Sequence, residues 1–314
     1  MTEKTVASDA VPPMAERPST LRIWLLAMRP ATLPAALSGV VVGLGATIAV
    51  GTQLHLGRAL ACLAVALLLQ IAANLANDLS DFRAGADTPD RTGPVRVAAA
   101  GLVTERQLEI AIAVVVILAG LVGLALVVVG GPVLLLLGAL AIVAAVAYTG
   151  GPWPYGYHGL GEVFVFVFFG LVAVIGTAYL QAGRVDPLFV AAAIPVGCLT
   201  TAILVVNNLR DIPTDTVAGK RTLAVILGRG PTIREYELLV AVATFVPISL
   251  VGGSLGWPVL LPVVTVWWWW GLIARVRSFE EPRKLNPVLK DTARLALVHS
   301  LLFGVGLALA GTVS

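Results

Sequence analysis

A long apolar run that starts near Ala59 ends in four polar side chains whose spacing places them on one side of a helix. These are Asn74, Asn77, Asp78 and Asp81, spaced three, one and three positions apart. Residues three and four apart share a helical face, so the four side chains project together. Carboxylate and amide oxygens suit Mg²⁺, which usually keeps waters and takes further oxygens from substrate phosphates. The pattern therefore predicts a magnesium site for a phosphorylated substrate.

A second apolar run ends in the same kinds of residue. Asn208 precedes Asp211 by three positions, and Asp215 follows Asp211 by four. Pro213 lies between the two aspartates, and proline disrupts a helix interior, so this pair could straddle a break. Two acidic helix ends with one pattern predict a single polar, metal-binding site.

Basic side chains surround both stretches and could hold diphosphate oxygens through charge-assisted hydrogen bonds. They are Arg83, Arg91 and Arg96 after the first stretch, and Lys220 and Arg221 after the second. Asp87 and Asp90 lie in the loop beyond Gly85. The alternative is that the acids cap a helix on its wet side and that the basic residues are ordinary juxtamembrane charge. Acids at a helix C-terminus oppose the macrodipole, which weakens that alternative.

The composition indicates a polytopic membrane protein. The 314 residues are 58% hydrophobic and 12% charged, whereas soluble domains carry about 25% charged residues. The formal net charge is +3 and no Lys/Arg-rich block is present, which argues against nucleic-acid binding. Cys62 and Cys198 lie inside apolar runs, with neither metal nor disulfide spacing.

Nine apolar runs approach the roughly 20 residues that a helix needs to cross lipid. They cover residues 23–50, 58–80, 104–129, 132–148, 159–182, 187–209, 236–255, 258–275 and 292–312. Gly130-Gly131-Pro132 separates the third run from the fourth, because proline cannot continue a helix. Residues 1–20 are polar and contain proline, so we expect a disordered cytoplasmic tail followed by one nine-helix domain over residues 21–314.

The charge distribution predicts the orientation of these helices. With the N-terminus inside, all but Arg58 and Arg184 of the 21 basic residues fall on the cytoplasmic side. Of the 18 acidic residues, only Asp186 falls on the other side. The C-terminus is then outside. Polar groups gathered on one face suit an enzyme with cytoplasmic substrates better than a transporter, which needs openings on both sides.

The segment of residues 148–162 also faces the cytoplasm in this topology, yet it contains neither lysine nor arginine. Its glycines and prolines suit either a shaped wall over the site or a tight connection between helices. His158 lies within it, and a lone histidine is more often a hydrogen-bonded structural group than a base.

Together these segments resemble the UbiA-type intramembrane prenyltransferases, and among them the dihydroxynaphthoate polyprenyltransferases of menaquinone synthesis. The resemblance covers about residues 22–312. It is carried by A-M-R-P-A-T-L-P-A-A from Ala27, N-L-A-N-D-L-S-D-F-R-A-G-A-D from Asn74, R-T-G-P-V-R from Arg91, Y-T-G-G-P-W-P-Y-G-Y-H-G-L-G-E from Tyr148, and N-N-L-R-D-I-P-T-D from Asn207. The chain departs from the wider family at Gly85, where many members have a third aspartate; Asp87 follows two positions later.

The resemblance implies an all-α polytopic fold of nine transmembrane helices around a central cavity, with a cytoplasmic polar cap, in a bacterial plasma membrane. It implies two Mg²⁺ ions held by the aspartate motifs, for which the candidates are Asp78, Asp81, Asp87, Asp211 and Asp215. These ions bind the diphosphate of a polyprenyl donor. Ionisation leaves an allylic cation, which dihydroxynaphthoate attacks with loss of its carboxylate, giving demethylmenaquinone.

The residues agree with this chemistry. Metal ions and cationic side chains stabilise charge on a leaving diphosphate, and a helix bundle keeps water from the allylic cation. Aromatic faces such as Tyr148 or Phe82 could contact that cation. The expected catalytic residues are Asp78, Asp81, Asp211, Asp215 and Tyr148. The expected substrate-binding residues are Asn74, Asn77, Arg83, Arg91, Arg96, Asn208, Lys220, Arg221 and Arg29.

Arg29, at an Arg-Pro break in the first helix, is the candidate to hold the acceptor carboxylate. The alternative is an interfacial anchor that snorkels to water. Two other functions stay open: a prenyltransferase of the same superfamily with another aromatic acceptor, such as hydroxybenzoate, haem or chlorophyllide, and a secondary transporter. A transporter would show inverted repeats and charges near the midplane. Prenyl chain length and homo-oligomerisation are not fixed by the sequence.

Overall fold

The computed structural model describes residues 18–85, 93, 96–251 and 255–313, which form helices and connecting loops without a β-strand. In chain order the elements begin with α1 (Thr20–Met28), η1 (Pro30–Thr32), α2 (Leu33–Ala49), α3 (Leu56–Arg83), α4 (Glu105–Gly130), α5 (Pro132–Ala147), η2 (Tyr155–His158) and α6 (Gly161–Val165). They continue with η3 (Phe166–Val172), α7 (Ala173–Ala182), α8 (Pro187–Val217), α9 (Leu223–Leu227), α10 (Arg229–Ser249), η4 (Trp257–Thr265), α11 (Val266–Ser278), η5 (Pro282–Lys284) and α12 (Leu285–Val313). The expected tail lies mostly outside the described residues, as do Asp87, Asp90 and Arg91.

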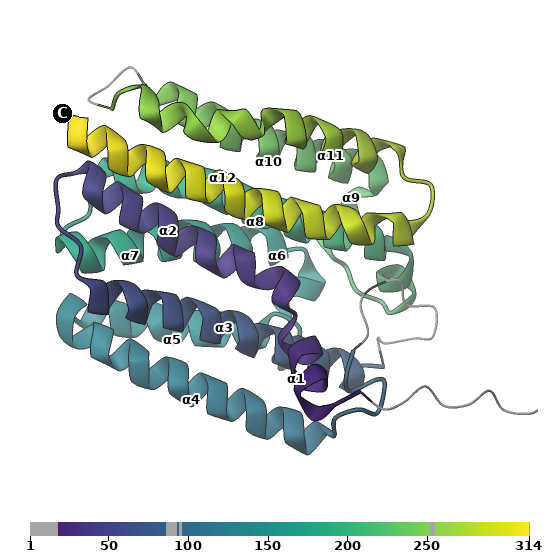
Figure 1. Cartoon of the computed structure of the whole chain (residues 1–314). Helices are drawn as coiled ribbons and strands as arrows, with labels where there is room; N and C mark the ends of the chain where they lie inside the picture. Colours follow the sequence, from purple (N-terminus) through teal and green to yellow (C-terminus); the bar gives the residue numbers. More distant parts are fainter. Residues whose placement is uncertain (1–17, 86–92, 94–95, 252–254, 314) are drawn as a thin grey trace, which may run out of the picture.

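The long helices lie side by side in one bundle (Figure 1). Seven described segments are long and apolar enough to cross a membrane: Thr20–Ala49, Leu56–Arg83, Glu105–Gly130, Gly161–Ala182, Pro187–Val217, Trp257–Ser278 and Pro282–Gly311. The apolar helix α5 is shorter, with 16 residues, and α10 is not among the seven. The expectation of an all-α, multi-pass membrane protein is therefore confirmed, whereas the count of nine spans stays a prediction.

Local sequence explains where several helices begin. Thr104 and Gln107 form a capping box at the start of α4, which satisfies two backbone donors that have no partner within the helix. Asp186 accepts a hydrogen bond from the Leu188 N–H at the start of α8, and Pro187 occupies the first helical position. Pro132 likewise opens α5. Of these helices, α8 carries the second acidic stretch, and its cap fixes where the helix begins, at the end opposite to that stretch.

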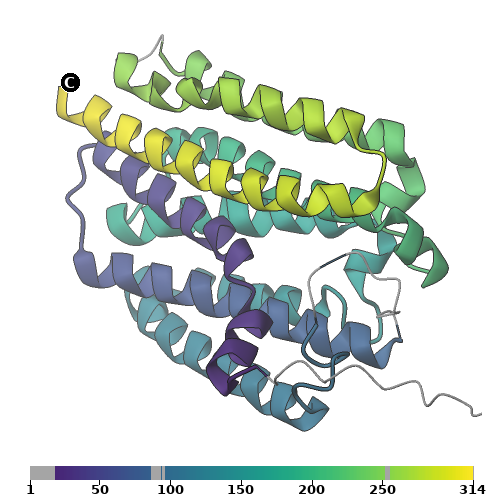
Figure 2. The ribbon, with the colours of Figure 1, turned by 45° about the vertical axis from the view of Figure 1, so that its right-hand side comes forward.

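The first apolar run forms two helices rather than one. The chain changes direction between α1 and α2 (Figure 2), where Arg29 has a φ of 51°. Arg29 is the only non-glycine residue with positive φ among the described residues. This backbone conformation is costly for any residue that has a Cβ. Asn74 holds this break in place, because its amide nitrogen lies 2.9 Å from both the Met28 carbonyl oxygen and the Thr32 hydroxyl oxygen.

Pro213 does not break α8, so the expectation that Asp211 and Asp215 straddle a break is wrong. The helix continues to Val217 with Pro195 and Pro213 inside it. Within the most apolar stretch of α8, 78% of the residues are buried, and this burial stabilises the helix. Packing against neighbouring helices can offset the hydrogen bond that a proline removes.

Two halves of the bundle differ in how closely their helices pack. Gly45 of α2 lies against Gly304 of α12 so closely that a Cβ on Gly45 would be 2.2 Å from the Gly304 carbonyl oxygen. Only a glycine allows this approach, which brings α2 and α12 close together. In contrast, only 11% of the residues in the most apolar stretch of α4 are buried, and α4 lies with α5 at the edge of the bundle (Figure 1).

Candidate functional site

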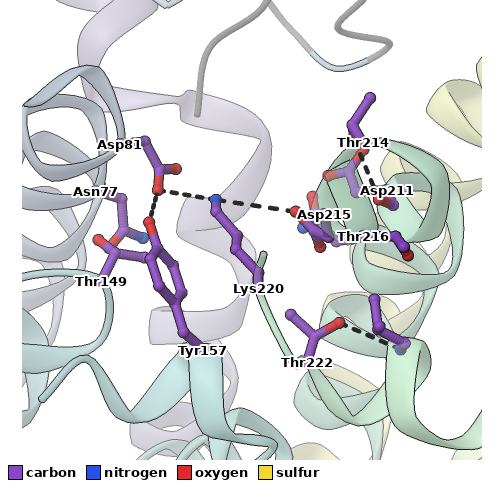
Figure 3. Close-up of polar contacts among 12 residues, drawn as sticks. Asn77, Asp81, Thr149, Tyr157, Asp211, Thr214, Asp215, Thr216, Lys220 and Thr222 are labelled. Atoms are coloured by element: carbon purple, nitrogen blue, oxygen red, sulfur yellow. Dashed lines mark hydrogen bonds and ion pairs between the residues drawn. The ribbon is translucent and has the colours of Figure 1, made fainter. Parts of the chain in front are cut away.

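Lys220 joins the two acidic helix ends. Its ammonium nitrogen lies 2.9 Å from Asp81 Oδ1 of α3 and 3.8 Å from Asp215 Oδ1 of α8 (Figure 3). All three side chains are largely buried, with exposures of 11%, 3% and 13% respectively. The structure therefore brings together the two stretches that the sequence assigns to one polar site.

Asp81 is the most highly connected of these acids. Its carboxylate accepts hydrogen bonds from the Arg96 guanidinium and the Tyr157 hydroxyl in addition to the Lys220 contact. Arg96 also donates to the Asn77 carbonyl at 2.5 Å, which fixes the segment after α3 against that helix. Burial raises the pKa of Tyr157, and the Asp81 charge raises it further, so the hydroxyl keeps its proton and remains a donor.

Tyr157 was not among the residues chosen from the sequence. It lies in η2, within the 148–162 segment, and the Lys220 nitrogen is 4.5 Å from its ring centroid. Its carbonyl accepts the Arg221 N–H at 3.0 Å. This segment and the loop after α8 are thus held to each other at the polar end of the bundle. The absence of basic residues from an aromatic, glycine-rich segment was the sequence signal that could have pointed to it.

Asp78 has different partners although it shares the α3 end with Asp81. Its carboxylate oxygens lie 3.1 Å from the Val97 nitrogen and 3.4 Å from the Ala98 nitrogen. The side chain is buried, so these backbone donors replace water. Asp78 therefore anchors the turn that follows Arg96.

On α8, Asp211 is bound by its neighbour in the chain, Arg210. Arg210 donates to both carboxylate oxygens of Asp211, at 2.8 and 2.6 Å. Its guanidinium also reaches Asn207 Oδ1 at 2.8 Å and Asn286 Oδ1 at 3.0 Å. Asn208, which was predicted to bind substrate, donates to the buried Glu162 at 2.8 Å. Asn207 and Arg210, which were not predicted from the sequence, line the cavity described below.

Two expected phosphate-binding cations are not gathered here. Arg83 pairs with Glu105 at 2.7 Å and with Glu109, both on α4, and its side chain is 48% exposed. Arg221 is exposed and reaches the site through its backbone. Asp87 and Arg91 lie outside the described residues, so their expected roles stay predictions.

A cavity of about 730 Å³ begins at the same polar end and continues between apolar side chains. Among its polar lining residues are Arg29, Asn74, Asn77, Asn207, Arg210, Asn286 and Lys290. Tyr148 lines it too. The cavity combines hydrogen-bonding groups at one end with a dry interior.

The donor atoms fit Mg²⁺ in company with a diphosphate. No three His, Cys, Asp or Glu side chains cluster closely enough to hold a metal by themselves within the described ranges. Asp81, Asp211 and Asp215 instead offer carboxylate oxygens, with the Asn77 and Asn207 amides beside them. Mg²⁺ typically uses one or two carboxylates and completes its shell with waters and substrate phosphates.

Residues 36–311 match the UbiA prenyltransferase family. A protein named 1,4-dihydroxy-2-naphthoate octaprenyltransferase from Mycobacterium tuberculosis (strain ATCC 25618 / H37Rv) is 44% identical, over 91% of this chain and 96% of its own length. A protein of the same name from Escherichia coli (strain K12) is 39% identical, over 93% of this chain and 96% of its own.

Solved structures show the same fold at much lower identity. A UbiA homologue from Aeropyrum pernix K1 superimposes with a TM-score of 0.65 at 18% identity, covering 88% of this chain and 97% of that one. A UbiA homologue from Archaeoglobus fulgidus, solved with GPP and Mg²⁺ bound, gives a TM-score of 0.63 at 14% identity, covering 91% and 99%. With a family match over most of its length, this chain belongs to the UbiA prenyltransferase family.

Proposed function

We propose that this protein transfers a polyprenyl group from polyprenyl diphosphate to 1,4-dihydroxy-2-naphthoate, with loss of the acceptor carboxylate, to give demethylmenaquinone in its reduced form. The observation that carries this is the contact of Lys220 with both aspartate stretches at the polar end of a dry cavity. The names of the relatives from M. tuberculosis and E. coli support the choice of acceptor.

In this proposal, Asp81, Asp211 and Asp215 hold Mg²⁺ together with the donor diphosphate. The ion neutralises charge on the leaving diphosphate. Asp78 was expected to be a ligand as well, but its bonds to the backbone of residues 97 and 98 favour a positioning role. Asp87 stays a candidate from the sequence alone.

Cationic side chains act on the same leaving group. Arg96 and Lys220 already face Asp81, and each carries donors that can turn to phosphate oxygens. The bond between the prenyl C1 and the diphosphate oxygen breaks, with its electron pair leaving on the diphosphate. The apolar cavity excludes water from the allylic cation that remains. The ring faces of Tyr148 and Phe164, which both line the cavity, can stabilise it.

The acceptor meets a different group of cations. Arg29, Arg210 and Lys290 line the polar part of the cavity, and we assign the acceptor carboxylate to Arg29. The ring carbon that bears this carboxylate forms the new bond to the prenyl C1. Loss of carbon dioxide from that carbon restores the aromatic ring without a protein base, which agrees with a purely structural role for His158, whose Nδ1 is 2.9 Å from the Pro154 carbonyl oxygen.

The topology in this proposal has nine spans, obtained when α5 and α10 are added to the seven long apolar segments. The N-terminus and the polar end lie in the cytoplasm, the C-terminus lies outside, and the protein resides in a bacterial plasma membrane. The excess of basic residues on the polar side supports this orientation.

The test uses purified protein in lipid nanodiscs with Mg²⁺, one polyprenyl diphosphate and a panel of aromatic acceptors. Dihydroxynaphthoate should be prenylated with release of carbon dioxide, and hydroxybenzoate should not. Prenylation of another acceptor while dihydroxynaphthoate is ignored would contradict the proposal. Substrate movement across sealed vesicles without product formation would instead identify a transporter.

A further inference from the structure

The cavity runs along much of the length of two helices, α3 and α5. On α3 its lining residues extend from Asn77 at the polar end to Cys62, which are 15 positions apart. At 1.5 Å per residue this corresponds to about 22 Å of helix. On α5 the lining extends from just past the helix, at Tyr148, back to Leu134. The space is therefore an elongated channel rather than a pocket confined to the polar end.

Three glycines from three helices line this channel: Gly123 of α4, Gly138 of α5 and Gly176 of α7. A Cβ added to any of them would meet no neighbouring heavy atom within 4 Å. They differ from packing glycines such as Gly45, where an added Cβ would collide with backbone. These three glycines therefore leave open space inside the channel instead of bringing helices together.

The three glycines lie six or seven residues from the helix ends on one side of the bundle, a position that we call the glycine level. Gly123 is seven residues before the end of α4, Gly138 six residues after the start of α5, and Gly176 six residues before the end of α7. These helix ends meet, because the Tyr179 hydroxyl of α7 donates to the Gly130 carbonyl of α4 at 3.0 Å. The glycine level is thus roughly 10 Å from that end of the bundle.

Beyond the glycine level the channel is lined by leucines. Leu126 and Leu180 are buried, and Leu134 packs against them. Gly130 makes room for Leu134, since a Cβ there would lie 2.1 Å from Leu134 Cδ1. In the other direction, Gly138 precedes Tyr148 by ten residues, or about 15 Å along the helix. The glycine level therefore divides the channel into a section near the polar end and a terminal section.

We propose that the terminal section receives the distal isoprene units of the donor, so that Gly123, Gly138 and Gly176 determine the longest prenyl tail that the enzyme uses efficiently. The inference rests on the proposed function. A diphosphate at the polar end leaves the apolar tail to run along the channel, where it is removed from polar groups. A tail short enough to end before the glycine level would not contact these positions, whereas a longer tail would have to pass them.

The test is a pair of matched substitutions on α4, Gly123→Phe and Gly120→Phe. Gly120 also has open space around it but does not line the channel, so it controls for a phenylalanine on the same helix. For each variant, kcat/KM is measured with geranyl, farnesyl and octaprenyl diphosphates. We expect Gly123→Phe to lower the octaprenyl value by about 10–200-fold, as misfit in an apolar pocket does. The geranyl value should stay within about threefold of the wild-type value, and Gly120→Phe should leave kcat/KM unchanged for all three donors.

Gly138→Phe and Gly176→Phe provide the same measurement from the other two helices, and Gly123→Leu replaces Gly123→Phe if the larger side chain lowers expression. Leu180→Ala should act in the opposite direction and raise the octaprenyl-to-farnesyl ratio. Equal losses for all donors, or no loss for any, in correctly folded Gly123 and Gly176 variants would overturn the inference and indicate a tail that leaves sideways into lipid. The result is a ratio of kcat/KM values between donors, and it can be measured with any acceptor that the wild-type enzyme uses. Failure to prenylate dihydroxynaphthoate would therefore refute only the proposed function.

Discussion

On α3, the Asp81 side chain is 3% exposed and Asp78 is buried, whereas on α8 the Asp211 and Asp215 side chains keep exposures of 14% and 13%. The α3 acids are bound to groups from distant parts of the chain: the backbone of residues 97 and 98, Arg96 and Tyr157. Asp211 is held by its own neighbour, Arg210, and Asp215 by the Lys220 contact.

This contrast shows how one residue pattern performs two tasks. The α3 end organises the polar end of the bundle, because its acids bind the segment after the helix and the tyrosine of η2. The α8 carboxylates keep more exposure, so they need less rearrangement to reach a metal and a diphosphate. We therefore expect substitutions on α3 to affect both stability and turnover, and those on α8 to affect mainly turnover.

Asp81→Asn should have the largest effect. The substitution removes a carboxylate that faces Arg96 and Lys220, and with it a proposed Mg²⁺ ligand. Loss of one strong electrostatic contact to a reacting group commonly lowers kcat by about 10²–10³, and the disturbed cations should place this variant at the upper limit. Turnover in nanodiscs at saturating Mg²⁺ measures it. Activity within tenfold of wild type would remove Asp81 from the metal site.

Asp211→Asn should lower kcat by about 10²-fold and raise the Mg²⁺ concentration needed for half-maximal rate. The amide keeps an oxygen for Arg210, so the thermal transition should change little. Mg²⁺ titration of the rate, with calorimetric melting alongside, separates the two effects. A melting temperature lowered as far as that of Asp78→Asn would contradict the contrast between the helices.

Asp78→Asn tests the structural task of α3. An amide offers one acceptor oxygen where the carboxylate offers two, so one of the Val97 and Ala98 donors loses its partner. A buried unsatisfied group costs about 1–3 kcal/mol of unfolding free energy. Positioning partners of a metal site typically contribute about 10–100-fold to activity. Melting temperature and turnover should therefore fall together, and a loss of turnover with unchanged melting would return Asp78 to the set of direct ligands.

The sequence was sufficient for the features that depend on spacing along one helix. Apolar runs identified the helices, and the repeated Asn-plus-Asp pattern predicted that Asp81 and Asp215 would meet. The choice between Asn207 and Asn208 depends on the rotation of α8 against its neighbours, which packing decides. Arg210 and Tyr157 escaped notice for the same reason, since their contacts join segments far apart in the chain.

Pro213 illustrates the second limit. Propensity predicts a break, but the buried surface of α8 outweighs one missing hydrogen bond. Such a balance is set by tertiary contacts that a single sequence does not display. The positions of Arg96 and Lys220 relative to Asp81 belong to the same class.

Tyr157→Phe should have a smaller effect than the aspartate changes. It removes the hydroxyl that donates to Asp81 but keeps the ring beneath Lys220. A hydrogen bond to a charged group contributes about 1.5–3 kcal/mol, of which the remaining Arg96 and Lys220 contacts should preserve a part. Because the raised pKa of Tyr157 keeps its proton in place, variant and wild type should share one pH profile between about pH 6 and 9. A changed profile would mean that the hydroxyl takes part in proton transfer.

Arg83→Ala should have the smallest effect, although Arg83 lies only two positions beyond Asp81. Its guanidinium pairs with Glu105 and Glu109 of α4 on the half-exposed side of the helix, and exposed ion pairs contribute little because solvent screens them. Turnover and its dependence on donor diphosphate should match wild type, with at most a small change in melting temperature. The measurement separates proximity in sequence from proximity in space. A KM for the donor raised tenfold would show that Arg83 leaves α4 to bind diphosphate, and that the α3 end is more adaptable than its buried contacts indicate.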